Sequence, residues 1–189
     1  NGPSDLLYGT YLGGNQLDWL NALALDGRGR AWVTGWTTSP DFPVRGGFQP
    51  AHHGKDDAFV ACIDTSEKGD AALAWSSYLG GSENDWALGM AADGAGRLYL
   101  TGWTASPDFP VRGGFQSTYN GGADAFVISI DTSEKGDASL AWSSLLGGSE
   151  KERGHGIALD GAGRLYLAGW TSSPDFPVRG GFQTALHGD

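Results

Sequence analysis

The chain repeats itself with a period of 67 residues, and this repeat limits the possible folds more than any other feature. The string GWTTSPDFPVRGGFQ begins at Gly35, and nearly the same string begins at Gly102 and again at Gly169. Between residues 11–77 and 78–144, 45 of 67 aligned positions are identical. A period of this length indicates an array of similar units, each of which buries its apolar faces against its neighbours.

Each unit contains four segments that have the character of β-strands. In the first unit they are residues 21–27, 31–37, 57–64 and 73–81. Asp-Gly-x-Gly joins the first pair, which is a tight hairpin signal, and a longer polar turn joins the last pair. The third segment, DAFVACID, is apolar at odd and even positions alike, so we expect both faces of its sheet to be covered. The pattern predicts an all-β fold made of β-propeller blades, each with four antiparallel strands.

The third unit is incomplete. Three full units would need 201 residues, and the chain has 189, with no counterpart in the third unit for the strand within 56–67. We therefore expect eleven strands and a processed or partial chain. The predicted organisation is a single propeller array over residues 1–189, with an N-terminal outer strand (1–14), a first blade (15–81), a second blade (82–148) and a partial third blade (149–189).

Composition excludes several classes of partner. The chain has 12 lysines and arginines against 22 aspartates and glutamates, a net charge of −10. Nucleic-acid binding needs a basic face, so we expect no nucleic-acid partner. No run approaches the roughly 18 apolar residues of a membrane span, so we expect no membrane insertion. The single cysteine, Cys62, excludes an intramolecular disulfide and a cysteine-rich zinc site.

One stretch of the chain is similar to a known repeat. The strings YLGGSENDWALGMAADGAGRLYLTGWTASPDFP and GGADAFV lie close together in the second unit. The run from Leu79 to Phe126 resembles the bacterial "seven-bladed beta-propeller" repeat, abbreviated SBBP. The combination of LGG, D-G-x-G, TGWT-S-DFP and DAFV within these strings is specific, although no one of these pieces is. The resemblance implies a propeller fold and an exported or cell-surface bacterial protein, and it implies no catalytic residues.

Differences between the units gather at one end of the predicted blades. That end carries the connection between the second and third strands, and the corner that leads into the next unit. Loops on a rigid scaffold often carry binding sites, so we expect a ligand at this rim. The alternative is that these are solvent-tolerant loops with packed tryptophans. The candidate ligand-binding residues are Asp18, Trp19, Asp85, Trp86, Glu152, His53, Tyr119 and His187.

Motifs of catalysis are not found in the sequence. The four histidines do not recur at equivalent positions in all units, and neither Gly-x-Ser-x-Gly, HExxH, a Walker motif nor a dinucleotide fingerprint occurs. Cys62 lies in a predicted strand, where we expect a buried apolar side chain. We therefore expect no catalytic residues, no metal site and no cofactor.

Three functions remain open at this point. The first is a non-enzymatic, exported repeat module that acts as a structural or protein-interaction scaffold by self-assembly. Its partners would be copies of itself, in a homo-oligomer or fibre, or the remaining blades of a longer chain. The second is a multivalent lectin that binds glycans or cell-surface proteins through aromatic side chains. An enzyme with its site in a central channel is the third and least favoured.

Overall fold

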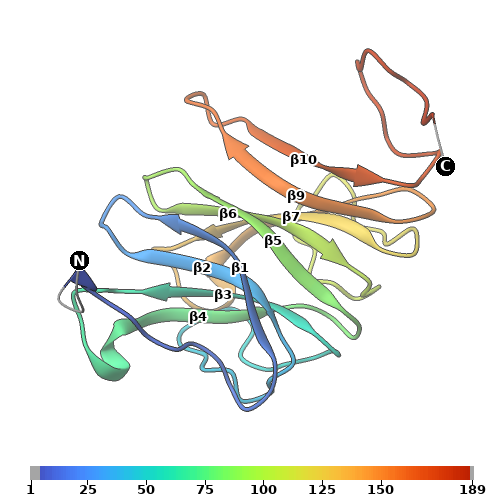
Figure 1. Cartoon of the computed structure of the whole chain (residues 1–189). Helices are drawn as coiled ribbons and strands as arrows, with labels where there is room; N and C mark the ends of the chain where they lie inside the picture. Colours follow the sequence, from blue (N-terminus) through green and yellow to red (C-terminus); the bar gives the residue numbers. More distant parts are fainter. Residues whose placement is uncertain (1–4, 188–189) are drawn as a thin grey trace.

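The computed structural model, which describes residues 5–187, is all-β (Figure 1). Within those residues, the strands form two four-stranded antiparallel sheets and one two-stranded sheet, each in chain order. The strands are β1 (Asp18–Leu25), β2 (Ala31–Thr37), β3 (Asp57–Ile63), β4 (Leu73–Leu79), β5 (Asp85–Ala92), β6 (Arg97–Thr104), β7 (Asp124–Asp131), β8 (Leu140–Leu146), β9 (Glu152–Leu159) and β10 (Leu165–Thr171). Two short 3-10 turns, η2 (Gly69–Ala72) and η3 (Gly136–Ser139), precede β4 and β8. The prediction of four-stranded antiparallel blades is confirmed.

An aspartate shapes the tight hairpin at the start of each unit. In the first unit, the Asp26 side chain accepts hydrogen bonds from the backbone nitrogens of Arg28 (2.8 Å) and Arg30 (3.0 Å). Gly29 has a φ of +80°, which a glycine adopts at little cost. Asp93 and Asp160 make the equivalent bonds in the other units. The Asp-Gly-x-Gly signal is thus a turn, as its sequence indicates.

A bulge in the first strand of each sheet depends on a glycine in the second. The register between β5 and β6 shifts between Ala87 and Gly89. Opposite the bulge, a Cβ at Gly102 would overlap the carbonyl oxygen of Trp86 and lie 2.8 Å from the Phe126 ring. The backbone can approach so closely only because Gly102 has no side chain.

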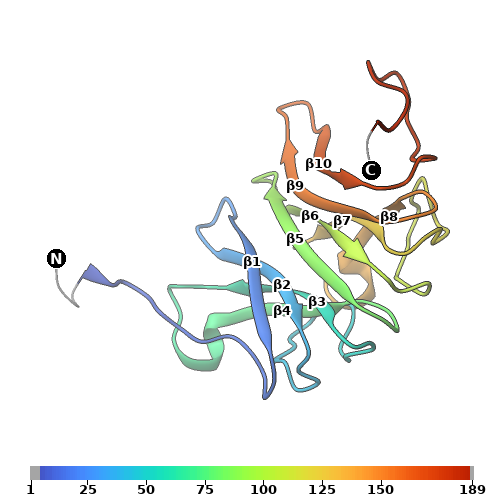
Figure 2. The ribbon, with the colours of Figure 1, turned by 45° about the vertical axis from the view of Figure 1, so that its right-hand side comes forward.

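The sheets stack on one another like the blades of a propeller, side by side in chain order (Figure 2). Each junction is made by the first strand of one sheet, which packs against the first three strands of the sheet before it, and most closely against the first two. The main apolar core lies between the first two sheets and includes Trp32, Val60, Leu100 and Ile128. Both faces of β3 and β7 are buried, as the sequence predicts.

The expected N-terminal strand is absent from the described residues. Residues 6–14 form no strand, so residues 5–187 contain ten strands where eleven were expected for the chain. A strand needs a hydrogen-bonded neighbour, and the chain provides no third strand beside this segment. The result is plain at Tyr11, which is fully exposed, whereas its counterpart Tyr78 in β4 is 1% exposed.

The long loop after the second strand folds back along the outer edge of its own sheet. Arg45 and Ser76 exchange backbone hydrogen bonds (3.2 and 2.9 Å), and the Gln49 carbonyl accepts from Tyr78 N (3.1 Å). Arg112 and Ser143 repeat the exchange in the second unit. The loop therefore covers the edge of β4 and of β8, which would otherwise offer unpaired backbone groups to another chain.

Phe42 anchors the start of this loop. Its ring is 3% exposed and lies 4.5 Å, between centroids, from Phe59 of the same sheet. Phe109 packs on Phe126 in the same way, at 4.8 Å. Phe42 and Phe109 thus hold the long loop against its own sheet.

Among residues 5–187, no helix has the length and apolarity that crossing a membrane requires.

Candidate functional site

The three acidic residues predicted for the rim lie at the first position of β1, β5 and β9. Asp85 is fully buried, and one of its oxygens accepts from Gly81 N (2.8 Å) and from the Ser106 hydroxyl (2.8 Å). Glu152 is 1% exposed and accepts from Gly148 N (2.9 Å). Asp18 accepts from Gly14 N (2.9 Å). These carboxylates lie beneath the rim, where they hold the glycine corner that leads into each sheet.

A second set of aspartates, which the sequence analysis did not select, faces the first set. Asp57 and Asp85 lie on either side of Gly80, because a Cβ on that glycine would be 2.8 Å from an oxygen of each. Asp124 and Glu152 flank Gly147 in the same way. The available signal was the aspartate that opens each DAFV string, since a charged residue at the head of a fully apolar strand is unusual.

Burial changes the acidity of these groups. Loss of water around the carboxylate raises the pKa of Asp85 to about 6, although hydrogen bonds from Thr104 and Gly81 oppose the shift. Burial also raises the pKa of Asp124 to about 6, and the nearby charge of Glu152 adds to the shift. Burial raises the pKa of Asp57 as well. Each junction between sheets thus contains a carboxyl group that takes up a proton at a higher pH than an exposed aspartate does.

The predicted stacking residue Trp86 is packed inside a junction. Its ring lies flat against Trp36 of the preceding sheet, with centroids 4.8 Å apart and planes 8° apart. On its other side is Trp103, at 5.2 Å, and its indole nitrogen donates to Asp56 (2.9 Å). Trp86 therefore joins two sheets in this structure.

At the next junction an arginine takes the place of Trp86. The Arg153 guanidinium lies 4.7 Å from the Trp103 ring centroid and 5.6 Å from that of Trp170. Cation–π attraction thus replaces aromatic stacking. The rings and the guanidinium form a stacked column, which we define as Trp36, Trp86, Trp103, Arg153 and Trp170.

The two ends of this array of sheets expose residues that the junctions bury. At the first sheet, Trp19 is 62% exposed and Leu20 is 48% exposed, whereas their counterparts Trp86 and Ala87 lie within a junction. At the last sheet, Trp170 is 43% exposed, whereas Trp103 is 7% exposed. Trp19 is thus the aromatic of the predicted set that is open to solvent.

The predicted loop residues are dispersed among the three units. His53 is exposed, and its backbone nitrogen donates to Asp57 (2.9 Å). Tyr119 is half-buried against the main core, and this burial raises its pKa. His187 is exposed beyond the last sheet. They lie on equivalent long loops but in different units, so they do not converge on one point.

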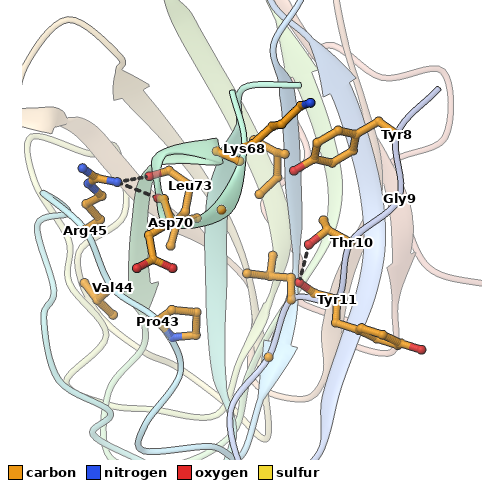
Figure 3. Close-up of a pocket in the computed structure, with 15 residues that line it drawn as sticks. Tyr8, Gly9, Thr10, Tyr11, Pro43, Val44, Arg45, Lys68, Asp70 and Leu73 are labelled. Atoms are coloured by element: carbon orange, nitrogen blue, oxygen red, sulfur yellow. Dashed lines mark hydrogen bonds between the residues drawn. The ribbon is translucent and has the colours of Figure 1, made fainter. Parts of the chain in front are cut away.

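A hollow of about 650 Å³ lies between the N-terminal segment and the first sheet (Figure 3). Tyr8 and Tyr11 line it from one side, and Arg45 and Asp70 from the other. The Arg45 guanidinium donates to the carbonyl oxygens of Asp70 (2.8 Å) and Leu73 (2.9 Å), so it fastens the long loop to η2. Its lining contains neither a histidine nor a cysteine.

Within residues 5–187, no three histidine, cysteine or carboxylate side chains gather as a metal site. Cys62 is fully buried in β3, and burial raises the pKa of its thiol to about 12. At that pKa the thiol stays protonated at neutral pH, so it is a poor nucleophile.

Comparison with known proteins gives a match to one family. The family model described as SBBP, Beta-propeller repeat, matches residues 74–110 and 141–177. Each match starts in the fourth strand of one sheet and ends in the long loop after the second strand of the next. A search of curated proteins found no match.

Proposed function

Because the chain contains SBBP beta-propeller repeats, we propose that it is a non-enzymatic structural module that works by self-assembly. One observation carries this proposal: both ends of the array expose large apolar side chains whose counterparts are buried or half-buried at the internal junctions. Each such side chain stabilises an assembly by roughly 1.5–3 kcal/mol when it is buried. Two open faces would therefore cost much of the roughly 5–15 kcal/mol of a domain's net stability.

Light scattering across a range of protein concentrations tests this proposal. We expect a weight-average mass well above 19.8 kDa at micromolar concentration, with a mass that falls on dilution. A monodisperse species of 19.8 kDa across the whole range would contradict self-assembly.

A lectin is the second candidate, and the exposed ring of Trp19 favours it. An exposed tryptophan can stack on the CH face of a sugar. The position is not repeated as a site, since Trp86 is stacked within a junction and Arg153 replaces the ring in the third unit. A glycan array tests this candidate, with a Trp19→Ala variant as the control. Glycan binding that requires Trp19 would favour the lectin over the scaffold.

The place of action belongs to the same proposal. We infer an extracellular or cell-surface location from the resemblance to the SBBP repeat, which implies export. Fractionation of cells that produce the protein would test this inference, and a protein found entirely in the cytoplasmic fraction would contradict it.

A further inference from the structure

The same kind of junction between two sheets occurs twice in this chain. Each junction has two surfaces, and one of these surfaces recurs, uncovered, at each end of the array. In both internal junctions, the first strand of a sheet packs against the first three strands of the preceding sheet, and most closely against the first two. The stacked column crosses the first junction where Trp86 lies on Trp36, and it crosses the second where Arg153 lies on Trp103. The same two halves recur as β9 and β10 at one end of the array and as β1 at the other.

The open half at the end of the chain is the outer face of β10. Tyr166 and Trp170 lie 67 residues after Tyr99 and Trp103, on the side of the strand that faces the next sheet in the second unit. They are 54% and 43% exposed. Arg153 already covers one side of the Trp170 ring, and the other side has no partner among the described residues.

The open half at the start of the chain is the outer face of β1. Leu20, Leu23 and Leu25 are 48%, 61% and 63% exposed. They occupy the positions of Ala87, Met90 and Ala92, which pack toward the first sheet in the main core. Leu20 and Leu25 are bulkier than Ala87 and Ala92, the alanines at the equivalent positions. The last sheet has two strands where the others have four, so it leaves more room for these larger side chains.

We propose that a second copy of this chain docks its β1 on β10 of the first, so that Trp19 of the second copy stacks on Trp170. This inference rests on the proposed self-assembly and specifies which surfaces of two copies meet. We call this contact the joint. A second copy is the occupant that the structure favours, since it carries the complementary half at the repeat's own spacing. The contact is heterologous, so each copy keeps one open face and the assembly grows from head to tail.

Two charge-introducing variants test the two halves separately. Trp170→Glu disables the β10 face and Leu23→Glu disables the β1 face, while Phe115→Glu changes an exposed aromatic on a long loop at neither end. In sedimentation velocity, each of the first two variants alone should associate at least tenfold more weakly than the unaltered chain. An equimolar mixture of the two should form a 1:1 dimer, because each keeps the half that the other has lost. Phe115→Glu should assemble like the unaltered chain.

The mixture distinguishes this joint from other modes of assembly. Association that persists in Trp170→Glu or Leu23→Glu alone, or a mixture that forms no dimer, would overturn the joint and leave self-assembly standing. A monomeric unaltered chain would instead contradict the proposed function itself. Circular dichroism checks folding, and Tyr166→Glu and Leu20→Glu replace any variant that does not fold, with the same outcomes applied.

Discussion

At the scale of single residues, the junctions combine buried carboxyl groups with stacked rings. Asp85 is the clearest case, since it is fully buried and yet holds the glycine corner through Gly81. A carboxylate without water is destabilised, so the folded protein favours its protonated form. The stability of the fold should therefore respond to pH in a window where exposed aspartates do not titrate.

The expected response has a definite sign. The pKa of Asp85 is about 6 in the fold, against 3.8 for an ordinary aspartate, so the folded state binds more protons between these values. This contribution to stability is fully present below about pH 3.8 and is lost as the pH rises through 6. Between pH 5 and 7.5, the free energy of unfolding should fall by on the order of 1 kcal/mol because of this residue. Urea unfolding at the two pH values measures it.

An Asp85→Asn variant should lose that part of the pH dependence, because asparagine does not titrate. Asp108→Asn is the matched control: hydrogen bonds from Ser82 lower the pKa of Asp108, so its contribution changes only in more acidic solution. An unchanged slope between pH 5 and 7.5 in Asp85→Asn would show that another group causes it.

A second residue-scale prediction concerns the glycine opposite the bulge. Gly102→Ala should destabilise the protein by about 2–4 kcal/mol, since the new Cβ overlaps the Trp86 carbonyl and the Phe126 ring. Gly161→Ala is the control, because a Cβ there meets no atom within 4 Å. Thermal unfolding compares the two, and equal transition temperatures would mean that the backbone moves apart at little cost.

At the scale of elements, the long loop acts as an added edge to the sheet, and one glutamine fixes it. The Gln49 side chain donates to Asp57 (3.1 Å) and accepts from Gly80 N (3.0 Å). Gln116 makes the same pair of bonds with Asp124 (3.0 Å) and Gly147 (3.1 Å). Both glutamines therefore join the loop, a strand and the corner that follows.

The three equivalent glutamines provide their own control. Gln49→Ala and Gln116→Ala should each cost about 1–3 kcal/mol, because a buried backbone nitrogen loses its acceptor. Gln183→Ala should cost almost nothing, since the Gln183 side chain bonds to Ala185 in its own loop and is exposed. Hydrogen exchange at β4 and β8 should accelerate only in the first two variants. An equal loss of stability in all three would separate the effect from the sheet edge.

Prediction from sequence succeeded where the signal was local. The four strands of the first and second units follow from their turn residues and from apolar segments such as DAFVACID. It failed for the segment 6–14, because its composition matches β4 while its hydrogen-bonding neighbour is not in the chain. The sequence left open whether Trp86 is a ligand platform at the rim or a packed ring, because it does not reveal that a ring 50 residues away, Trp36, covers it.

At the scale of the whole molecule, the two-stranded last sheet is the least buried part of the array. Every residue of β10 is exposed or half-buried, whereas β6 is buried over most of its length. The reason is the lack of a third strand beside β10 in this chain, since the sequence has no counterpart there of residues 57–63.

Supplying that strand should change the molecule measurably. Adding ADAFVISIDTSE, the sequence of residues 123–134, after residue 189 should raise the transition temperature by several degrees and alter the stoichiometry, because the new strand pairs with β10. A scrambled extension of equal composition serves as the control. If both extensions leave the transition temperature and the stoichiometry unchanged, the incomplete sheet does not limit the stability or the assembly of this protein.

The loops that cover β4 and β8 also determine what kind of aggregate is accessible. The protein's own backbone occupies the edges of β4 and β8, and most of the exposed large apolar side chains among residues 5–187 lie at the two ends of the array. Contacts concentrated at two ends favour one-dimensional growth, and they disfavour branched or amorphous precipitates. A crowded solution of this protein should therefore thicken by lengthening its assemblies, and its viscosity should rise more steeply with concentration than its turbidity.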